Sequence, residues 1–152
     1  MLDAGRIAPE FSLKDVDGER RSLRENLKLG PVLVVFFKIN CPTCHLTLPF
    51  LERLKTSIRV VGISQDDASS TRGFANRFRL TFPTLLDLSE QQYPASNAYC
   101  ITSVPSLFLI EPDGLVSRAF AGFSKRDFEE IGARAGVAPF GPDDHVPEWK
   151  AG

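Results

Sequence analysis

The sequence predicts an α/β domain with a central mixed β-sheet flanked by helices. Short apolar runs of strand length alternate with longer stretches of helical periodicity, and short turns separate them. Residues 32–37 (Val-Leu-Val-Val-Phe-Phe) are apolar without polar alternation, which is typical of a strand buried on both faces. With 152 residues and 43% hydrophobic content, the chain is long enough for one domain with an ordinary core.

A small hairpin is predicted ahead of this sheet. Asp17-Gly18 is a dipeptide suited to a tight turn, and the segments 11–13 and 20–23 flank it as two short strands. The sequence therefore indicates an N-terminal β-hairpin extension that comes before the long buried strand.

A helix is predicted to begin directly after that strand, at Cys41 or Pro42, and to run to about Lys55. Proline is tolerated in the first turn, because the N–H that it lacks would be unpaired there in any case. Leucines then recur along one face. Pro49 lies inside the helix and should kink it, since its ring clashes with the carbonyl four residues back.

The remaining elements continue the alternation. Val60–Ile63 should form the next strand through a βαβ connection, and Ser69 or Ser70 should cap the helix that follows. The other expected elements are an extended piece at 82–87, a helix at 89–99 interrupted near Pro94, a buried strand at 106–110, an antiparallel strand at 115–120, and a last helix opened by Ser124 and Asp127 and ended by Gly136.

The domain is expected to span residues 1–137, with residues 138–152 as a C-terminal tail. Three prolines in the tail forbid a regular helix or a central strand. Phe140 and Trp149 are the side chains that can lay the tail against the body, and Trp149 is equally suited to an interface.

Charge and hydropathy narrow the possible partners. The net charge is −1 and the isoelectric point is near 6.1, so no summed positive field exists to recruit nucleic acid or an acidic membrane. The longest apolar run falls far short of the ~20 residues that span a bilayer. Residues 1–6 also lack the basic and apolar regions of a signal peptide. We therefore expect a cytoplasmic monomer, unless a leader preceded this sequence and directed it to the periplasm or beyond.

The chemistry is expected at Cys41-Pro-Thr-Cys44, which joins the buried strand to the helix. Two thiols three positions apart can close a disulfide across one helical turn. The unpaired N–H groups at a helix start favour a thiolate on the first of them. The chain has three cysteines in all, too few for a disulfide scaffold, and such a pair is typical of catalysis or metal binding. Cys41 is the predicted nucleophile.

Together these features resemble the thioredoxin superfamily, specifically the TlpA-like branch of thiol-disulfide oxidoreductases related to the redoxin (AhpC/TSA) family. The opening Ala8-Pro-Glu-Phe11, with the hairpin after it, is similar to the N-terminal extension of this branch. The resemblance covers nearly all of the chain before the tail. Its other carriers are the strand that leads into Cys41-Pro-Thr-Cys44, Pro49 eight residues after the first cysteine, Phe82-Pro83, and Val104-Pro105-Ser106 before the apolar run 107–110.

The resemblance implies thiol-disulfide exchange without a metal or other cofactor. Cys41 would attack a substrate disulfide, and Cys44 would then displace the mixed disulfide. Pro105 would be cis and packed opposite the dithiol, and the exposed backbone of Val104 would pair with an extended substrate. The implied partners are a disulfide-containing protein or a small thiol, and an electron donor that the sequence does not identify. A reductant is favoured, with roles in antioxidant activity and cell redox homeostasis.

Two positions depart from the family pattern. Thioredoxins carry a buried acid six residues before the first cysteine, and many TlpA-like proteins carry a Glu three residues after the second. Here these positions hold Val35 and Thr47, so water, His45 or Lys38 must receive the proton of the second thiol. The alternative is that neither residue takes part in the chemistry. His45 would then be a solvated helical side chain, and Lys38 would only extend its charged end into solvent. The residues expected to tune the thiols are Pro42, Thr43, His45 and Lys38.

Haem or metal binding is one competing hypothesis. Residues 41–45 (CPTCH) satisfy the pattern for covalent c-type haem, with His45 as one axial ligand and Met1 or His145 as the second. This hypothesis ranks well below thiol exchange, because the motif follows a buried sheet strand. A structural zinc site wants four ligands, and only Cys100 and His145 add soft candidates, so no metal site is predicted.

A peroxidase and a binding module also compete with thiol exchange. Peroxiredoxins share the fold, but if Cys44 took the peroxidatic position, the first cysteine would replace their Thr and Phe37 their Pro. The peroxidase motif is therefore absent. A redox-sensing or chaperone-like module would use the same disulfide to switch its affinity for a partner. Cys100 is interpreted as a small buried hydrophobe, and Asp66 and Asp67 as solvated acids.

Overall fold

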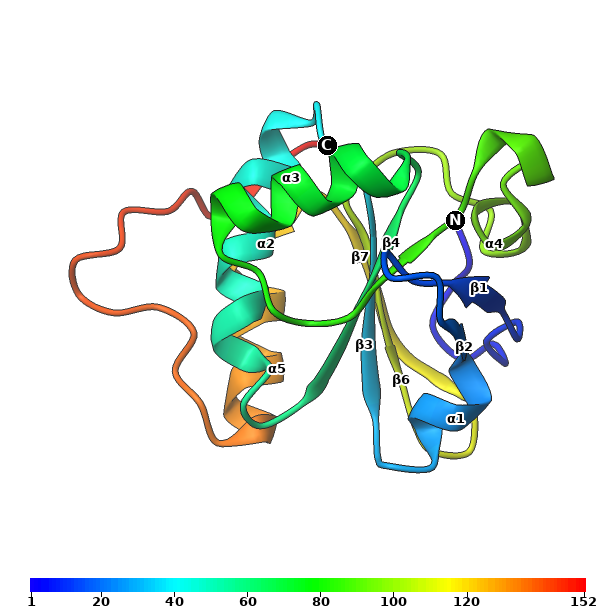
Figure 1. Ribbon diagram of the computed structural model, residues 1–152. Coiled ribbons are helices and arrows are strands. Elements are labelled where there is room, and N and C mark those ends of the chain that lie inside the picture. Colours follow the sequence, from blue (N-terminus) through cyan, green and yellow to red (C-terminus); the bar gives the residue numbers. More distant parts are fainter.

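β3 (Val32–Phe37) is the central strand, and all of its side chains are buried. The computed structural model describes all 152 residues of the printed sequence (Figure 1). β3 pairs in parallel with β4 (Arg59–Ser64) and antiparallel with β6 (Ser106–Ile110). β5 (Thr84–Leu86) joins β4 in parallel, and β7 (Val116–Ala121) joins β6 antiparallel. The result is a mixed sheet of order β5-β4-β3-β6-β7.

One face of the sheet is covered by α2 (Pro42–Leu54), α3 (Ala68–Phe78) and α5 (Lys125–Ala135) (Figure 1). Every second side chain of β3, starting with Leu33, belongs to the apolar core on this face. Because a strand alternates its side chains between two faces, the other half of β3 points to a second core. None of the helices is long and apolar enough to cross a membrane.

The second core lies under the N-terminal part of the chain. β1 (Ser12–Lys14) and β2 (Arg20–Ser22) form the hairpin, and the short helices α1 (Leu23–Leu27) and α4 (Pro94–Ala98) pack beside it (Figure 1). The 3-10 helix η1 (Ser89–Gln91) precedes α4. Since both faces of the sheet are covered, the free edges and strand ends are left for function.

Most predicted elements are confirmed. The hairpin, the buried strand at 32–37, the helix that follows it and the antiparallel strand near 115–120 are all present. The last helix begins after Ser124, whose hydroxyl accepts the N–H of Asp127 at 3.2 Å, and ends at Gly136 in a left-handed conformation. Local cap chemistry is therefore sufficient to place this helix.

The expected cap of α3 is wrong. The N-cap is Asp67, whose carboxylate accepts the N–H of Ser70 at 2.8 Å, so Ser69 and Ser70 lie inside the helix. Asp and Ser are nearly equal in N-cap preference, which is why the sequence alone does not separate them. The helix α1 is not predicted from the sequence, because five residues are too few to show periodicity.

The tail packs on the body at its beginning and at its end. Phe140 lies edge-to-face on Phe50 with ring centroids 4.9 Å apart, and Arg53 pairs with Asp144 at 2.7 Å. At its end, β9 (Trp149–Lys150) pairs antiparallel with β8 (Phe123–Ser124), a short strand just before α5. Trp149 is 62% exposed, so its backbone rather than its ring contacts the body.

Buried Asp87 is expected to contribute strongly to stability. Its two carboxylate oxygens accept the N–H groups of Ala95 at 3.0 Å and Ser96 at 2.7 Å, at the start of α4. Asp87→Ala leaves both buried donors without a partner, so the free energy of unfolding should fall by about 2–4 kcal/mol in urea denaturation. The control Asp3→Ala, at an exposed residue, should change it by less than about 0.5 kcal/mol. Equal effects of the two substitutions would contradict this role of Asp87.

Candidate active site

The two cysteines of the motif lie where β3 passes into α2. Cys41 is the N-cap residue of α2, and Pro42 takes the first helical position, where its missing N–H removes no hydrogen bond. Cys41 is half-buried, whereas Cys44 has no exposed surface. The helix start thus presents one thiol toward solvent and encloses the other.

The sulfur of Cys41 lies between a donor and an acceptor. It accepts the N–H of Cys44 at 3.1 Å, one of the groups that a helix leaves unpaired at its start. It also lies 3.4 Å from the carbonyl oxygen of Val104, to which the thiol donates. The Val104–Pro105 peptide bond is cis, as predicted. The Cys41 sulfur therefore has a hydrogen-bond partner in both protonation states. As a thiol it donates to the carbonyl of Val104, and as a thiolate it accepts the N–H of Cys44.

The environment of Cys44 opposes its ionisation. Burial raises the pKa of the Cys44 thiol far above its usual range, and a hydrogen bond with Cys41 and the negative charge of Asp66 act in the same direction. A backbone hydrogen bond with Lys38 opposes these effects. Cys44 is therefore an enclosed thiol that its surroundings keep in the neutral form.

Two threonines of α2, one between the cysteines and one after them, make hydrogen bonds through their hydroxyl groups. Thr43 is buried, and its hydroxyl donates to the backbone carbonyl of Ala151 in the tail at 2.6 Å. Thr47 is fully buried and donates to the carbonyl of Thr43 at 2.7 Å. Val35 packs in the apolar core. The structure thus brings Thr43 to the tail and leaves the two positions that hold acids in the family apolar or neutral.

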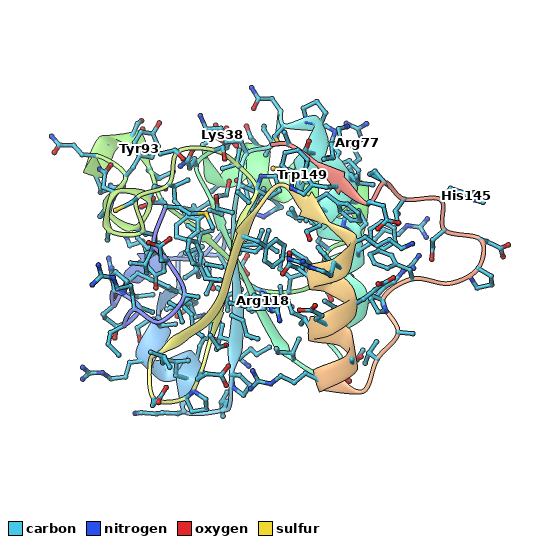
Figure 2. All side chains as sticks on the ribbon, turned by 180° about the vertical axis from the view of Figure 1, so that it is seen from behind. Lys38, Arg77, Tyr93, Arg118, His145 and Trp149 are labelled. Carbon is cyan, nitrogen blue, oxygen red and sulfur yellow. The ribbon has the colours of Figure 1, made fainter.

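His45 and Lys38 differ in their surroundings. The Nε2 atom of His45 lies 2.6 Å from the carbonyl oxygen of Ile39, and its ring packs on Phe74 and Phe78 at centroid distances of 5.5 and 5.1 Å. This packing holds the ring against α3 rather than in solvent. Lys38 is exposed at the same end of the molecule as Trp149 (Figure 2). A role of either residue in tuning the thiols stays a prediction.

Asp66 is the site residue that the sequence analysis missed. It is half-buried rather than solvated, and its carboxylate accepts the N–H of Ile39 at 2.8 Å, in the loop that leads to the dithiol. Asp66 follows β4, and parallel strands β3 and β4 end at the same edge of the sheet. The signal available in the sequence was an acid two residues after the strand that neighbours the dithiol strand.

Cys100 and His145, the other candidate residues, do not join the dithiol site. Cys100 is exposed and has a left-handed backbone (φ 53°), so its interpretation as a buried hydrophobe is wrong. His145, a candidate haem ligand, lies on the exposed tail loop that projects from the body (Figure 2). No group of three or more His, Cys, Asp or Glu side chains is arranged to hold a metal ion.

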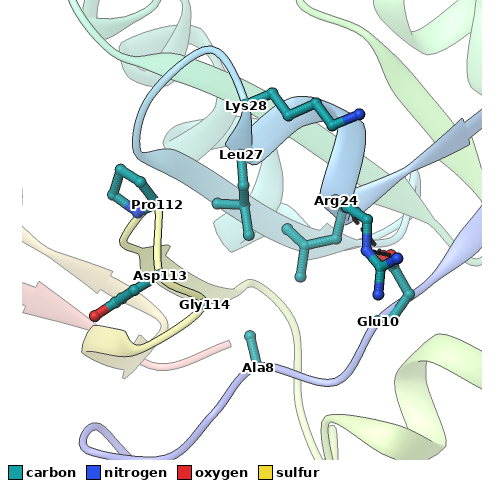
Figure 3. Close-up of a pocket in the computed structure, with 9 residues that line it drawn as sticks. Ala8, Glu10, Arg24, Leu27, Lys28, Pro112, Asp113 and Gly114 are labelled. Carbon is teal, nitrogen blue, oxygen red and sulfur yellow. Dashed lines mark hydrogen bonds and ion pairs between the residues drawn. The ribbon is translucent and has the colours of Figure 1, made fainter.

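A pocket of about 340 Å³ is drawn in Figure 3. It lies near the start of β3 and the end of β6, whereas the dithiol follows the other end of β3. It is bounded by α1 and by the turn at Pro112 to Gly114, which joins β6 to β7. Arg24 and Glu10 pair across its rim at 3.8 Å. The pocket contains no cysteine, so thiol chemistry belongs to the other end of the molecule.

The sheet, the hairpin and the dithiol beside a cis-proline define a thioredoxin-like redox protein of the redoxin type. A family model described as the AhpC/TSA family matches residues 4–119. The chain belongs to this family, within the TlpA-like part of the thioredoxin superfamily.

Individual relatives carry two kinds of names. The thiol-disulfide oxidoreductase ResA of Geobacillus kaustophilus is 30% identical over 132 residues, which cover 82% of this chain and 74% of the relative. A putative peroxiredoxin, bcp, of Helicobacter pylori is 31% identical over 133 residues, or 78% of this chain and 88% of the relative. The thioredoxin domain of a thiol-disulfide oxidoreductase from Bacteroides vulgatus has the same fold, with a TM-score of 0.77. The two chains are 21% identical, and the match covers 91% of this chain and 100% of that domain.

Removal of the Asp66 charge should ease ionisation of Cys44. Because that charge raises the pKa of Cys44, Asp66→Asn should lower it, while the Asn oxygen can still accept the N–H of Ile39. The measurement is the ultraviolet absorbance of the thiolate against pH, in a background where Cys41 and Cys100 are serine. Asp67→Asn, which keeps a good N-cap for α3, is the matched control and should leave the pKa of Cys44 unchanged. An unshifted titration in Asp66→Asn would remove Asp66 from the site.

Proposed function

We propose that this thiol-disulfide oxidoreductase reduces protein disulfides through Cys41 and Cys44. The observation that carries the proposal is the asymmetry of the two thiols. Cys41 is accessible at the N-terminus of α2, with its sulfur 3.1 Å from the N–H of Cys44, whereas Cys44 is fully buried one turn later. An accessible first thiol and an enclosed second thiol are what a two-step exchange requires.

In the first step, the Cys41 thiolate attacks one sulfur of a substrate disulfide. A mixed disulfide forms with Cys41, and the other substrate sulfur leaves as a thiolate. Cys44 then loses its proton and attacks the Cys41 sulfur, which releases the second substrate thiolate. The protein ends with a Cys41–Cys44 disulfide and has passed two electrons to the substrate. An external thiol donor restores the dithiol.

The environment of Cys44 supports the reducing direction. A strongly oxidising pair stabilises its reduced form, and a thiolate is the usual means of doing so. Here burial disfavours the Cys44 thiolate, so this residue adds no such stabilisation to the reduced pair. A reducing role fits a compartment that keeps thiols reduced, which is the ground for proposing the cytoplasm.

The substrate-binding part of the proposal concerns the loop opposite the dithiol. The carbonyl of Val104 lies 3.4 Å from the sulfur of Cys41, so an extended segment that pairs with the backbone here would bring its own sulfur close to Cys41. Pro105 has no N–H and cannot compete for that segment. We therefore assign Val104 and Pro105 to recognition of the disulfide-containing partner.

A thiol peroxidase is the second candidate, and the Helicobacter pylori relative named as a putative peroxiredoxin favours it. The buried state of Cys44 opposes it, because a peroxidatic cysteine must meet peroxide as a thiolate. Peroxide consumption coupled to a thiol donor separates the two. A rate with peroxide that exceeds the rate with a protein disulfide would reverse their order.

The reduction potential of the pair tests the direction of exchange. Free thiols are trapped by alkylation across ratios of reduced to oxidised glutathione and dithiothreitol. We expect one two-electron transition with a midpoint more negative than about −200 mV, closer to thioredoxin at about −270 mV than to protein disulfide isomerase at about −180 mV. Cys41→Ser should abolish the transition, and Cys100→Ser should preserve it. A midpoint above about −180 mV would assign an oxidant or isomerase instead.

Trapping of the mixed disulfide tests the two roles separately. Cys44→Ser removes the resolving thiol, so the variant should accumulate a covalent adduct with a disulfide-containing protein such as insulin. Both variants also carry Cys100→Ser, because Cys100 is exposed and could form an adduct of its own. Cys41→Ser should then form far less adduct, because its remaining thiol, Cys44, is buried. Non-reducing electrophoresis and mass spectrometry give the amounts. Equal adduct from both variants would show that the order of attack is not set by burial.

A further inference from the structure

The last residues of the tail lie along the same surface that carries the dithiol. β9 pairs antiparallel with β8, and the N–H of Lys125 donates to the carbonyl of Glu148 at 3.0 Å. The carbonyl of Ala151 then accepts the hydroxyl of Thr43 at 2.6 Å. Because Thr43 stands between the two cysteines, the tail crosses directly over the Cys41-Pro-Thr-Cys44 segment.

The final residue reaches the loop opposite the dithiol. A Cβ atom built on Gly152 would overlap the carbonyl oxygen of Val104 and would lie 2.7 Å from its carbonyl carbon and 3.3 Å from the nitrogen of Pro105. The Val104 carbonyl is also the group that accepts the Cys41 thiol at 3.4 Å. Residue 152 therefore lies on the backbone proposed to bind substrate, at a position where no side chain fits.

The body makes room for the tail in a second place. Gly122, just before β8, has a left-handed backbone (φ +78°), and a Cβ there would overlap the carbonyl oxygen of Lys150. Two glycines, one in the body and one in the tail, thus permit backbone-to-backbone contact. We use the name tail groove for the surface that the tail covers, formed by Gly122 to Ser124, Thr43 and Val104-Pro105.

The contacts in the tail groove are made mainly by backbone. The residues 148–152 are all exposed, and Trp149 is 62% exposed. Pairing through the main chain, with little burial of side chains, is how extended peptides add to an exposed strand. Such contacts depend weakly on sequence, so a substrate segment can make the same ones.

A tether keeps the tail close when it leaves the groove. Phe140 packs on Phe123 and Phe128 as well as on Phe50, and Arg53 holds Asp144. Hydrogen bonds from Arg53 and from the N–H of Gly141 lower the pKa of Asp144 to about 2, so this anchor is charged at neutral pH. Between the anchor and β9 only residues 145–148 remain, of which Val146 is partly buried against the apolar core. This short link gives the segment a high effective concentration at the groove.

We propose that residues 148–152 occupy the tail groove as an intramolecular pseudosubstrate, which an extended segment of a protein substrate must displace. The inference rests on the proposed exchange function and identifies the substrate class as polypeptides that present an extended strand with a glycine against Val104. Small disulfides reach the half-buried Cys41 without pairing along the groove and are not subject to this competition.

The test compares two glycines of the tail in the intact 152-residue chain. Gly152→Ala places a Cβ against the Val104 carbonyl and should expel the end of the tail. Gly141→Ala, whose Cβ would meet its nearest neighbour, Asp144 Oδ2, at an ordinary 3.5 Å, is the matched control. The substrates are insulin and bis(2-hydroxyethyl) disulfide, with dithiothreitol as donor. For insulin, Gly152→Ala should lower KM by about threefold to fivefold with kcat unchanged, since KM falls as the open fraction rises.

For the small disulfide, kcat/KM should stay within about twofold in both variants, since this substrate does not compete for the groove. A second measurement adds the blocked peptide Glu-Trp-Lys-Ala-Gly to the Gly152→Ala protein. This peptide should restore competitive inhibition against insulin, and the same peptide ending in alanine should not.

Three results would overturn the proposal. An insulin KM unchanged by Gly152→Ala would show that the tail does not compete. An equal loss of activity toward both substrates would show that the tail only braces the site. Failure of the peptide to inhibit would show that the groove does not bind free strands. Absence of Cys41-dependent turnover with either substrate in the unsubstituted protein would instead overturn the exchange function, and the pseudosubstrate with it.

Discussion

The burial of β3 on both faces is the constraint on which the rest of the structure depends. A strand with six apolar side chains must be covered on two sides, so helices and the N-terminal hairpin lie on opposite faces of the sheet. The strand then has only its ends free for polar chemistry. Past its carboxyl end the chain soon enters α2, and one of the first N–H groups of that helix, that of Cys44, donates to the sulfur of Cys41.

The site depends on differences in solvation more than on charged partners. Val35 and Thr47 stand where acids are found in related proteins, so neither supplies a buried carboxylate beside Cys44. Half-buried Asp66 acts from the neighbouring strand end and opposes ionisation of Cys44. In the proposed exchange, removal of water from one thiol, with access left to the other, sets the order of reaction.

The sequence was sufficient for the sheet, for α2 and for the cis bond at Pro105, because apolar periodicity, an N-terminal proline and a family motif encode them. It was insufficient where the outcome depended on residues distant in the chain. Asp66 joins the site only through the pairing of β3 with β4, and the exposure of Cys100 follows from a left-handed backbone that no local pattern signals. The contact between Thr43 and Ala151 spans 108 positions and has no sequence signature.

The close approach of Gly152 to Val104 has a practical consequence for protein engineering. Any polypeptide that continues past residue 152, such as an affinity tag, would leave the body at the loop beside Cys41. Its first residues would be held within reach of the reactive sulfur, and a cysteine among them would be exposed to adventitious cross-linking. Residues 1–7 join the body elsewhere, where the N–H of Leu2 donates to the carbonyl of Tyr99 and Ile7 bridges to Leu115. A fusion at that end therefore does not start from the contact between Gly152 and Val104.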